Sequence, residues 1–259
     1  MKRKTILDSL AKDERSLVAA AWDKAEQARR RYQVIFTSFL DPGQRALLDQ
    51  YAYLWDVNLD SWGGYDEAER CLVAFNPGEE AVPEADYPLV ALEAKGNFSF
   101  APATHRDYLG SLMALGMKRD TIGDILVKPD GCQLVLHENM LNYVLANWQA
   151  VGRVSVDVRP IGWDELQPPS PQIRRHRATV ATLRLDAVVA AAYGISRTQA
   201  ARLIRAGKLK HNFRPETRCD KLVEPADMLS LAGKGRAQLL EVGGQSRSGR
   251  RHIEIARWC

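Results

Sequence analysis

The stretch LRLDAVVAAAYGISRTQAARLIRAGKLKHN, residues 183–212, decides the fold of the C-terminal part of this chain. Four apolar residues recur in it at helical spacing: Leu185, Val188, Val189 and Ala192. Gly194 is placed to end that helix, Ser196 is a favourable N-cap for a second one, and Gly207 stops it. The alternation in KLKHN, residues 208–212, then predicts a short strand. The stretch therefore predicts two helices followed by a strand.

The second helix of this stretch is amphipathic and has a basic flank. Three apolar residues share one arc of the helix: Ala200, Leu203 and Ile204. Three arginines occupy an adjacent arc: Arg197, Arg202 and Arg205. On the following strand Lys208, Lys210 and Asn212 share one face. Because arginine binds phosphate bidentately and asparagine can contact a base or sugar, we predict one cationic surface for a phosphate backbone.

The charge of the chain is divided unevenly along its length. Residues 1–170 hold 18 Lys and Arg against 25 Asp and Glu, whereas residues 171–259 hold 18 against 7. A basic segment on an acidic body is typical of a nucleic-acid-binding module on a carrier. The alternative is a basic segment that only complements the acidic body or keeps the protein soluble.

Composition narrows the class of protein further. At 259 residues with 46% apolar content, the chain is long enough for one to three domains with real cores. We expect no transmembrane span, because no apolar run approaches the roughly 20 residues that one needs, and no secretory signal, because charges interrupt the basic start of the chain. The four cysteines are widely scattered, which predicts neither a zinc site nor a disulfide framework. We therefore expect a cytoplasmic protein without cofactor or metal, acting as a monomer.

The rest of the chain predicts an α+β protein. Residues 1–70 are predicted as a helical N-terminal domain, with Asp41 as N-cap and Pro42 at the first position of one helix. Residues 71–163 form a second domain, in which 88–160 follow a β-α-β-β-α-β order, the ferredoxin-like or RRM-like sandwich. Its strand segments LVALEAK and ILVKPD lack the aromatic cluster with which RRM sheets stack bases. We therefore do not expect RNA on that sheet.

A proline-rich linker is predicted between the second and third domains. It covers residues 164–180 and ends in three arginines, Arg174, Arg175 and Arg177, which either contact phosphate or are simply solvated. Residues 181–259 form the third domain.

Several spaced positions of that third domain resemble the S4 RNA-binding domain. They are Arg184-Leu185-Asp186, Gly194-Ile195-Ser196-Arg197, Ala200-Ala201, Leu203-Ile204, Gly207, Lys210-His211-Asn212, Val223 and Pro225-Ala226-Asp227. The resemblance implies a helix pair and strand surface that binds structured RNA. Phe213 and Ala226 stand where the family commonly has glycine, which leaves two turn geometries open.

Three further segments resemble the YlmH family of S4-domain proteins, which is related to photosystem II S4-domain proteins. They are FLDPGQRALL (39–48), HRDYLGSLMALGMKRDTIGDILV (105–127) and the tail with GKGR (233–236) and SRSGRR (246–251). The resemblance implies binding to rRNA on the large ribosomal subunit, with tRNA nearby, in rescue of stalled translation. It also implies a gene neighbourhood linked to cell division.

The RNA-binding residues expected from these patterns belong to the third domain. They are Arg184, Ser196, Arg197, Thr198, Arg202, Arg205, Lys208, Lys210, Asn212, Lys221, Lys234 and Arg236. No catalytic residue is expected. The rival interpretations are an S4-fused RNA-modifying enzyme such as a pseudouridine synthase, in which Asp186 would be catalytic, and a protein-interaction scaffold. For the charged block at 105–127 we expect a packing role rather than acid–base chemistry, or else an RNA or protein contact.

Overall fold

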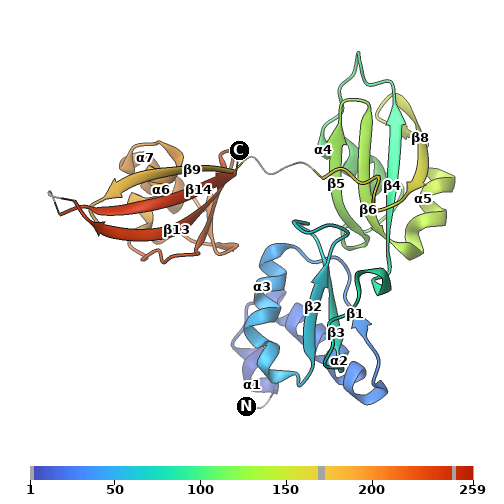
Figure 1. Cartoon of the computed structure of the whole chain (residues 1–259), viewed down its shortest axis with the longest axis horizontal. Helices are drawn as coiled ribbons and strands as arrows, with labels where there is room; N and C mark the ends of the chain where they lie inside the picture. Colours follow the sequence, from blue (N-terminus) through green and yellow to red (C-terminus); the bar gives the residue numbers. More distant parts are fainter. Residues whose placement is uncertain (1–2, 169–172, 247–248, 259) are drawn as a thin grey trace. The chain divides into compact units, whose positions relative to one another are not determined.

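The computed structural model describes residues 3–168, 173–246 and 249–258 and divides into two compact units, Met1–Pro169 and Ser170–Cys259 (Figure 1). Residues 169–172 of the predicted linker and residues 247–248 of the SRSGRR stretch lie outside the described residues. None of the described helices is long and apolar enough to cross a membrane.

The N-terminal part of the first unit combines helices with a small sheet. Its helices are α1 (Arg3–Asp8), α2 (Lys12–Arg31), α3 (Pro42–Tyr51) and the 3-10 turn η1 (Ala52–Leu54). Its antiparallel sheet has the order β1 (Ile35–Phe36), β3 (Leu72–Asn76), β2 (Asn58–Trp62). Helix α3 starts as predicted, because Asp41 and Gln44 form a reciprocal capping box and Pro42 follows the cap. Helix α2 ends at Arg31, and Tyr32 follows as its C-cap.

Strand β3 changes the boundary between the first two predicted domains. The sequence placed residues 71–76 in the second domain, but β3 pairs with β1 and β2 of the N-terminal part. The region before residue 70 is therefore not helical alone, and its sheet extends past that residue. All five residues of β3 are buried, and a strand that is apolar on both faces carries no signal of which sheet it joins.

The remainder of the first unit has the predicted β-α-β-β-α-β order. Its elements are η2 (Glu84–Asp86), β4 (Leu89–Gly96), α4 (His105–Ala114), η3 (Arg119–Thr121), β5 (Ile122–Lys128), β6 (Gly131–His137), η4 (Glu138–Met140), α5 (Leu141–Asn147), β7 (Ala150–Val151) and β8 (Val154–Ile161). The antiparallel sheet has the order β5-β6-β4-β8-β7. Helices α4 and α5 pack on one face, where Tyr108, Leu112 and Val144 meet Leu92 and Leu134.

The second unit is a six-stranded antiparallel sheet with two helices on one face (Figure 1). Its elements are β9 (Ile173–Val180), α6 (Leu185–Tyr193), α7 (Arg197–Arg205), β10 (Leu209–His211), β11 (Arg214–Pro215), β12 (Met228–Leu231), β13 (Gly235–Gln245) and β14 (Arg251–Trp258). The sheet order is β11-β10-β12-β13-β14-β9. The predicted α+β class is confirmed.

Strand β9 contains the C-terminal part of the predicted linker. Residues 173–180 pair along their whole length with β14, so the segment that the sequence assigned to a spacer belongs to the sheet of the second unit. The basic run that includes Arg175 and Arg177 hid this strand, because an edge strand with one solvated face needs few apolar residues. Arg177 contacts Glu254 of β14 at 3.5 Å, with 86% of the arginine side chain exposed.

Candidate nucleic-acid interface

Helix α6 packs in the core of the second unit and supports the basic surface. Five of its apolar or aromatic residues are buried: Leu185, Val188, Val189, Ala192 and Tyr193. The Tyr193 hydroxyl donates to the carbonyl oxygens of Leu229 at 2.7 Å and Gly235 at 3.0 Å, which fixes the end of the helix on the sheet. Gly194 ends α6 in the left-handed region at φ 63°, as predicted.

Helix α7 turns one face into the core and another to solvent. The Ser196 hydroxyl caps it by accepting a hydrogen bond from the backbone N–H of Gln199 at 3.2 Å, and Ala200 and Ile204 are fully buried. Thr198, Arg202 and Arg205 are exposed, and their spacing places them on one face of the helix. The predicted division of this helix into an apolar and a basic side is confirmed.

The strand after α7 continues the basic surface. Gly207 makes the turn at φ 67°, after which Lys208 and Lys210 are exposed while Leu209 and His211 are buried. This is the predicted alternation. Within the part of the chain that the structure describes, none of four cations forms an ion pair: Arg202, Arg205, Lys208 and Lys210. We call these four residues the α7–β10 cluster.

Two other predicted contact residues are held by a carboxylate of the same unit. Asp186 is 6% exposed, and both of its oxygens meet the Arg197 guanidinium at 3.1 Å. Arg184 contacts it at 3.5 Å. Burial alone would raise the pKa of Asp186, but hydrogen bonds and charges from Arg197 and Arg184 hold it below its usual range. Arg197 therefore ties the start of α7 to the start of α6, although about half of its side chain, 53%, stays exposed.

Asn212, which was predicted to face RNA, is part of a turn. Asn212 and Phe213 have φ values of 47° and 64° and join β10 to β11 as a two-residue hairpin loop. The Asn212 amide donates to Asp227 at 2.6 Å, and its oxygen accepts from the backbone N–H of Met228 at 2.8 Å. Both polar groups of its side chain are thus engaged within the domain.

The neighbouring His211 completes this turn network. Its Nε2 donates to Asp227 at 2.7 Å, and the imidazole is 5% exposed. Burial would raise the pKa of Asp227, but hydrogen bonds from the backbone N–H of Glu224, from Asn212 and from His211 lower it. The motif Lys210-His211-Asn212 therefore contributes one exposed cation and two structural side chains.

The remaining predicted residues lie apart from the cluster along the chain. Lys221 is paired with Glu216 at 3.0 Å, and Lys234 and Arg236 are half-buried at and before the start of β13. Across the sheet, Arg236 lies opposite Ser230, which in turn lies opposite Lys210. Arg214, which the residue patterns did not single out, is an exposed cation that lies opposite His211 across the hairpin. A hairpin signal at residues 212–213 would have found it, but Phe213 is not a typical residue for that turn.

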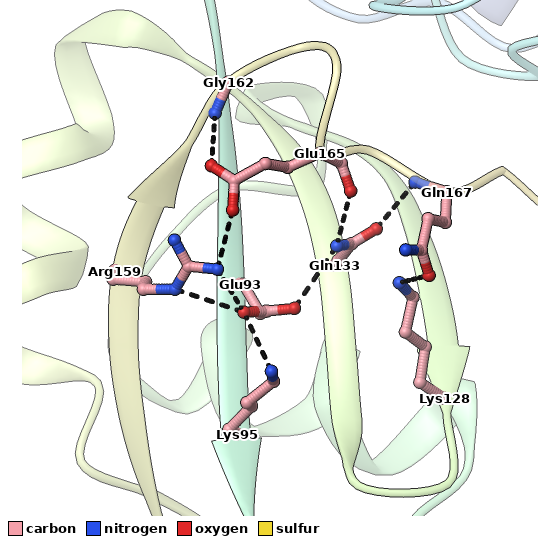
Figure 2. Close-up of polar contacts among 8 residues, drawn as sticks. All are labelled: Glu93, Lys95, Lys128, Gln133, Arg159, Gly162, Glu165 and Gln167. Carbon is pink, nitrogen blue, oxygen red and sulfur yellow. Dashed lines mark hydrogen bonds and ion pairs between the residues drawn. The ribbon is translucent and has the colours of Figure 1, made fainter.

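The helix-free face of the RRM-like sheet is occupied by a polar network (Figure 2). Glu93 of β4 binds Arg159 at 2.8 Å and Lys95 at 3.4 Å, and Gln133 of β6 donates to Glu93 at 3.3 Å. The segment 162–167 lies over it, since Glu165 binds Arg159 at 2.9 Å and the Gln167 N–H donates to Gln133 at 2.8 Å. Burial would raise the pKa of Glu93, but hydrogen bonds from Arg159, Lys95 and Gln133 lower it.

This network bears on where RNA can bind. RRM sheets use aromatic side chains of the two central strands as stacking platforms, and here β4 and β6 carry a paired carboxylate and an amide instead. The other end of the same face packs on the N-terminal part, where Phe39 and Leu72 meet Ala91 and Val135. The expectation against base stacking on this sheet stays a prediction, which the polar network supports.

The charged block at 105–127 forms a joint between the two parts of the first unit. Asp124 accepts hydrogen bonds from the Tyr65 hydroxyl at 2.8 Å and from the backbone N–H groups of Glu69 at 2.7 Å and Arg70 at 3.2 Å. The Arg70 guanidinium donates to the carbonyl oxygens of Ile122 at 3.0 Å and Phe39 at 2.9 Å.

Arg119 adds a second guanidinium to this joint. It donates to the carbonyl oxygens of Ile122 and Gly123, and burial together with the charge of Arg70 lowers its pKa to about 10. A Cβ atom at Gly123 would lie 2.7 Å from the Phe39 ring, so the contact requires glycine there. Arg119 and Asp124 of the block therefore pack at this joint, as expected, whereas Arg106 and Lys118 are exposed.

Among the described residues, no group of three or more His, Cys, Asp or Glu side chains is arranged to hold a metal ion. Cys71, Cys132 and Cys219 are buried free thiols. Burial raises the pKa of Cys132 to about 12.

The helix pair, its glycine turn and the exposed α7–β10 cluster place this chain among the S4-domain proteins, and the S4 family model matches residues 183–229. Two further models, described as the N-terminal domain of YlmH and a putative RNA-binding domain in YlmH, match residues 13–79 and 83–165. The chain is 30% identical over 252 residues to "Ribosome-associated protein quality control protein P2" of Bacillus subtilis (strain 168), covering 97% of this chain and 98% of that protein. It belongs to the YlmH family.

A solved structure shares part of the fold. "Cell division protein ylmH from Streptococcus pneumoniae" superposes with a TM-score of 0.52 at 19% identity, covering 60% of this chain and 95% of that one. At that identity the likeness concerns the fold alone.

Proposed function

We propose that this protein is a non-catalytic RNA-binding protein of the cytoplasm that binds structured rRNA on the large ribosomal subunit, close to tRNA, in quality control of stalled translation. The observation that carries the proposal is the α7–β10 cluster, four exposed cations without ion pairs in the described part of the chain. The name of the Bacillus subtilis relative, a ribosome-associated quality control protein, supports the setting.

The cluster has the chemistry that a phosphate backbone requires. Arg202 and Arg205 lie on one helix face, Lys208 directly follows the Gly207 turn, and Lys210 lies on strand β10. Cations that are already paired must break a contact before they bind phosphate, whereas these four only lose water and counterions. Helix and strand hold their backbone positions fixed, which favours a structured RNA over an irregular one.

The burial of Asp186 supports the non-catalytic part of the proposal. In the rival interpretation this residue of the Arg184-Leu185-Asp186 motif would attack a base, but it is 6% exposed and bound by two arginines. A nucleophilic or basic carboxylate must reach its substrate. Mass mapping of pseudouridine in rRNA from a deletion strain tests this point, and a missing modification would contradict the proposal.

The central test neutralises the cluster in the full chain. We expect Arg202→Ala with Arg205→Ala and Lys210→Ala to weaken co-sedimentation with large ribosomal subunits at least tenfold. The dependence of log K on log salt should also become shallower by roughly 0.9 for each lost phosphate contact. Arg197 is left intact, because its removal would disturb Asp186.

A matched control removes the same amount of charge elsewhere. Arg106→Ala with Lys118→Ala and Arg153→Ala replaces three exposed cations of the first unit. Circular dichroism and thermal melting should show both triple variants folded. Equal losses of binding in the two variants would mean that net charge, not the α7–β10 cluster, governs the interaction, and would contradict the proposal.

A further inference from the structure

The end of helix α2 combines three arginines with a tyrosine in an unusual backbone conformation. Arg29, Arg30 and Arg31 form its last turn, and Tyr32 follows as the C-cap with φ 51° and ψ 46°. The Tyr32 N–H donates to the carbonyl oxygen of Ala28, which satisfies the helix end. All four residues from Arg29 to Tyr32 are exposed.

Folding does not explain the tyrosine. The left-handed region is disfavoured for bulky L residues, and glycine or asparagine usually occupies it at a helix C-terminus. Tyr32 is 76% exposed, so burial of its ring offsets little of that strain. Strained residues that the core does not need are found at functional sites, and the strain here holds an aromatic ring in solvent.

The three arginines in the last turn of α2 are also more cations than the helix end needs for its stability. The helix dipole favours cations in a last turn, which accounts for positive charge in general. Arg30 contacts Glu26 at 3.6 Å, but Arg29 and Arg31 have no ion pair among the described residues. This is a basic patch on a segment, 1–170, in which acidic residues outnumber basic ones by 25 to 18.

We propose that the end of α2 is a second RNA contact, separate from the α7–β10 cluster. Arg29 and Arg31 bind phosphates while the Tyr32 ring stacks on an unpaired base. Bases inside a duplex are covered on both faces, so the contact suits a single-stranded or looped segment of RNA. The ring beside the arginines offers a base a stacking surface, and an anionic membrane, which would use the same arginines, is distinguished by a vesicle-binding measurement.

Because the second unit is tethered to the first, a weak contact of this kind raises the affinity of the whole chain by avidity. The proposal does not rest on the function of the α7–β10 cluster, and the test keeps the two apart. Every variant is made in the full chain, both with the native cluster and with the Arg202→Ala, Arg205→Ala, Lys210→Ala background.

The decisive variant is Tyr32→Gly. Glycine relieves the backbone strain, so the melting temperature should rise, while affinity for a mixed-sequence single-stranded RNA of about ten nucleotides should fall about tenfold. The matched control is Tyr53→Ala, which removes another tyrosine of the same unit with 75% exposure but no strained backbone, and should bind as before. Fluorescence anisotropy measures the affinity.

The arginines are tested in parallel. In the cluster-neutralised background, Arg29→Ala with Arg31→Ala should remove the residual salt-dependent binding of the oligonucleotide. Unchanged binding by Tyr32→Gly, or an equal loss with Tyr53→Ala, would overturn the proposal. So would binding to phosphatidylserine vesicles that depends on Arg29 and Arg31 when RNA binding does not. If neutralising the α7–β10 cluster leaves RNA binding as in the native chain while the α2 variants weaken it, the proposed function is contradicted and the α2 contact is supported.

Discussion

The joint around Asp124 and the α7–β10 cluster are both rich in arginine, yet they are built in opposite ways. At the joint the guanidinium of Arg70 donates to backbone carbonyl oxygens, and Asp124 binds three donors from the segment 65–70. In the cluster Arg202 and Arg205 stand in solvent without an ion pair in the described part of the chain. Arginine thus stabilises the fold at the joint, whereas in the cluster its side chains are available to bind a ligand.

The difference lies in what surrounds each charge. Burial lowers the pKa of Arg70 and Arg119, which shows that their environment disfavours a free charge and that their hydrogen bonds must hold it. Exposed cations are hydrated and need no such hydrogen bonds, so removing them changes the free energy of unfolding little. Mutations in the two regions should therefore separate stability from binding.

The largest effect is expected at the joint. Asp124→Ala should lower the free energy of unfolding by about 3 kcal/mol, because it leaves the Tyr65 hydroxyl and two backbone N–H groups without their acceptor. Urea denaturation measures the change. RNA binding by the folded fraction should stay as in the native chain.

The distinction between the joint and the α7–β10 cluster would be contradicted if mutations in the two regions changed the free energy of unfolding equally. Arg202→Ala, the counterpart in the cluster, should change the free energy of unfolding by less than about 0.5 kcal/mol. A stability loss at Arg202 of the size expected at Asp124 would show that the cluster is structural.

Arg197 lies between these extremes and should show a smaller, pH-dependent effect. Its removal should cost about 1 kcal/mol at pH 7, because Asp186 loses the partner that keeps its pKa low. A lowered carboxyl pKa stabilises the fold above the unfolded value, near 3.8, and this contribution is lost as pH falls through the folded pKa.

Unfolding curves at a series of pH values test this. The native chain and Arg197→Ala should differ at pH 7 and converge below pH 3.8, the ordinary value of the carboxyl. A difference that persists in acid would assign the cost to packing rather than to the ion pair.

The smallest change is expected to be favourable. Ala226 has φ 72° and is exposed, and its conformation is the one in which the S4 family commonly has glycine. Ala226→Gly should raise the free energy of unfolding by roughly 0.5 to 1 kcal/mol by removing that strain, without a change in RNA binding. Thermal melting of the two chains gives the result, and a loss of stability would mean that the methyl group packs more than its exposure indicates.

Local patterns predicted much of this protein. Ser196, Gly194 and Gly207 fixed the bounds of the two helices because caps and turns depend on neighbouring residues only. The β-α-β-β-α-β order followed from hydrophobic periodicity for the same reason. Strand β9 and the sheet of β3 were missed, because pairing partners far along the chain leave no local mark.

The sequence by itself determined the charge asymmetry, the alternation of Lys208 and Lys210 with buried neighbours, and the family to which the chain belongs. Only the tertiary structure decided which cations are available. Asp186 forms an ion pair with Arg197, and Asp227 binds His211 and Asn212. These partners are separated along the chain, so a pattern of residues cannot show that they are neighbours. An ion pair is set by distance in space, and a sequence gives only distance along the chain.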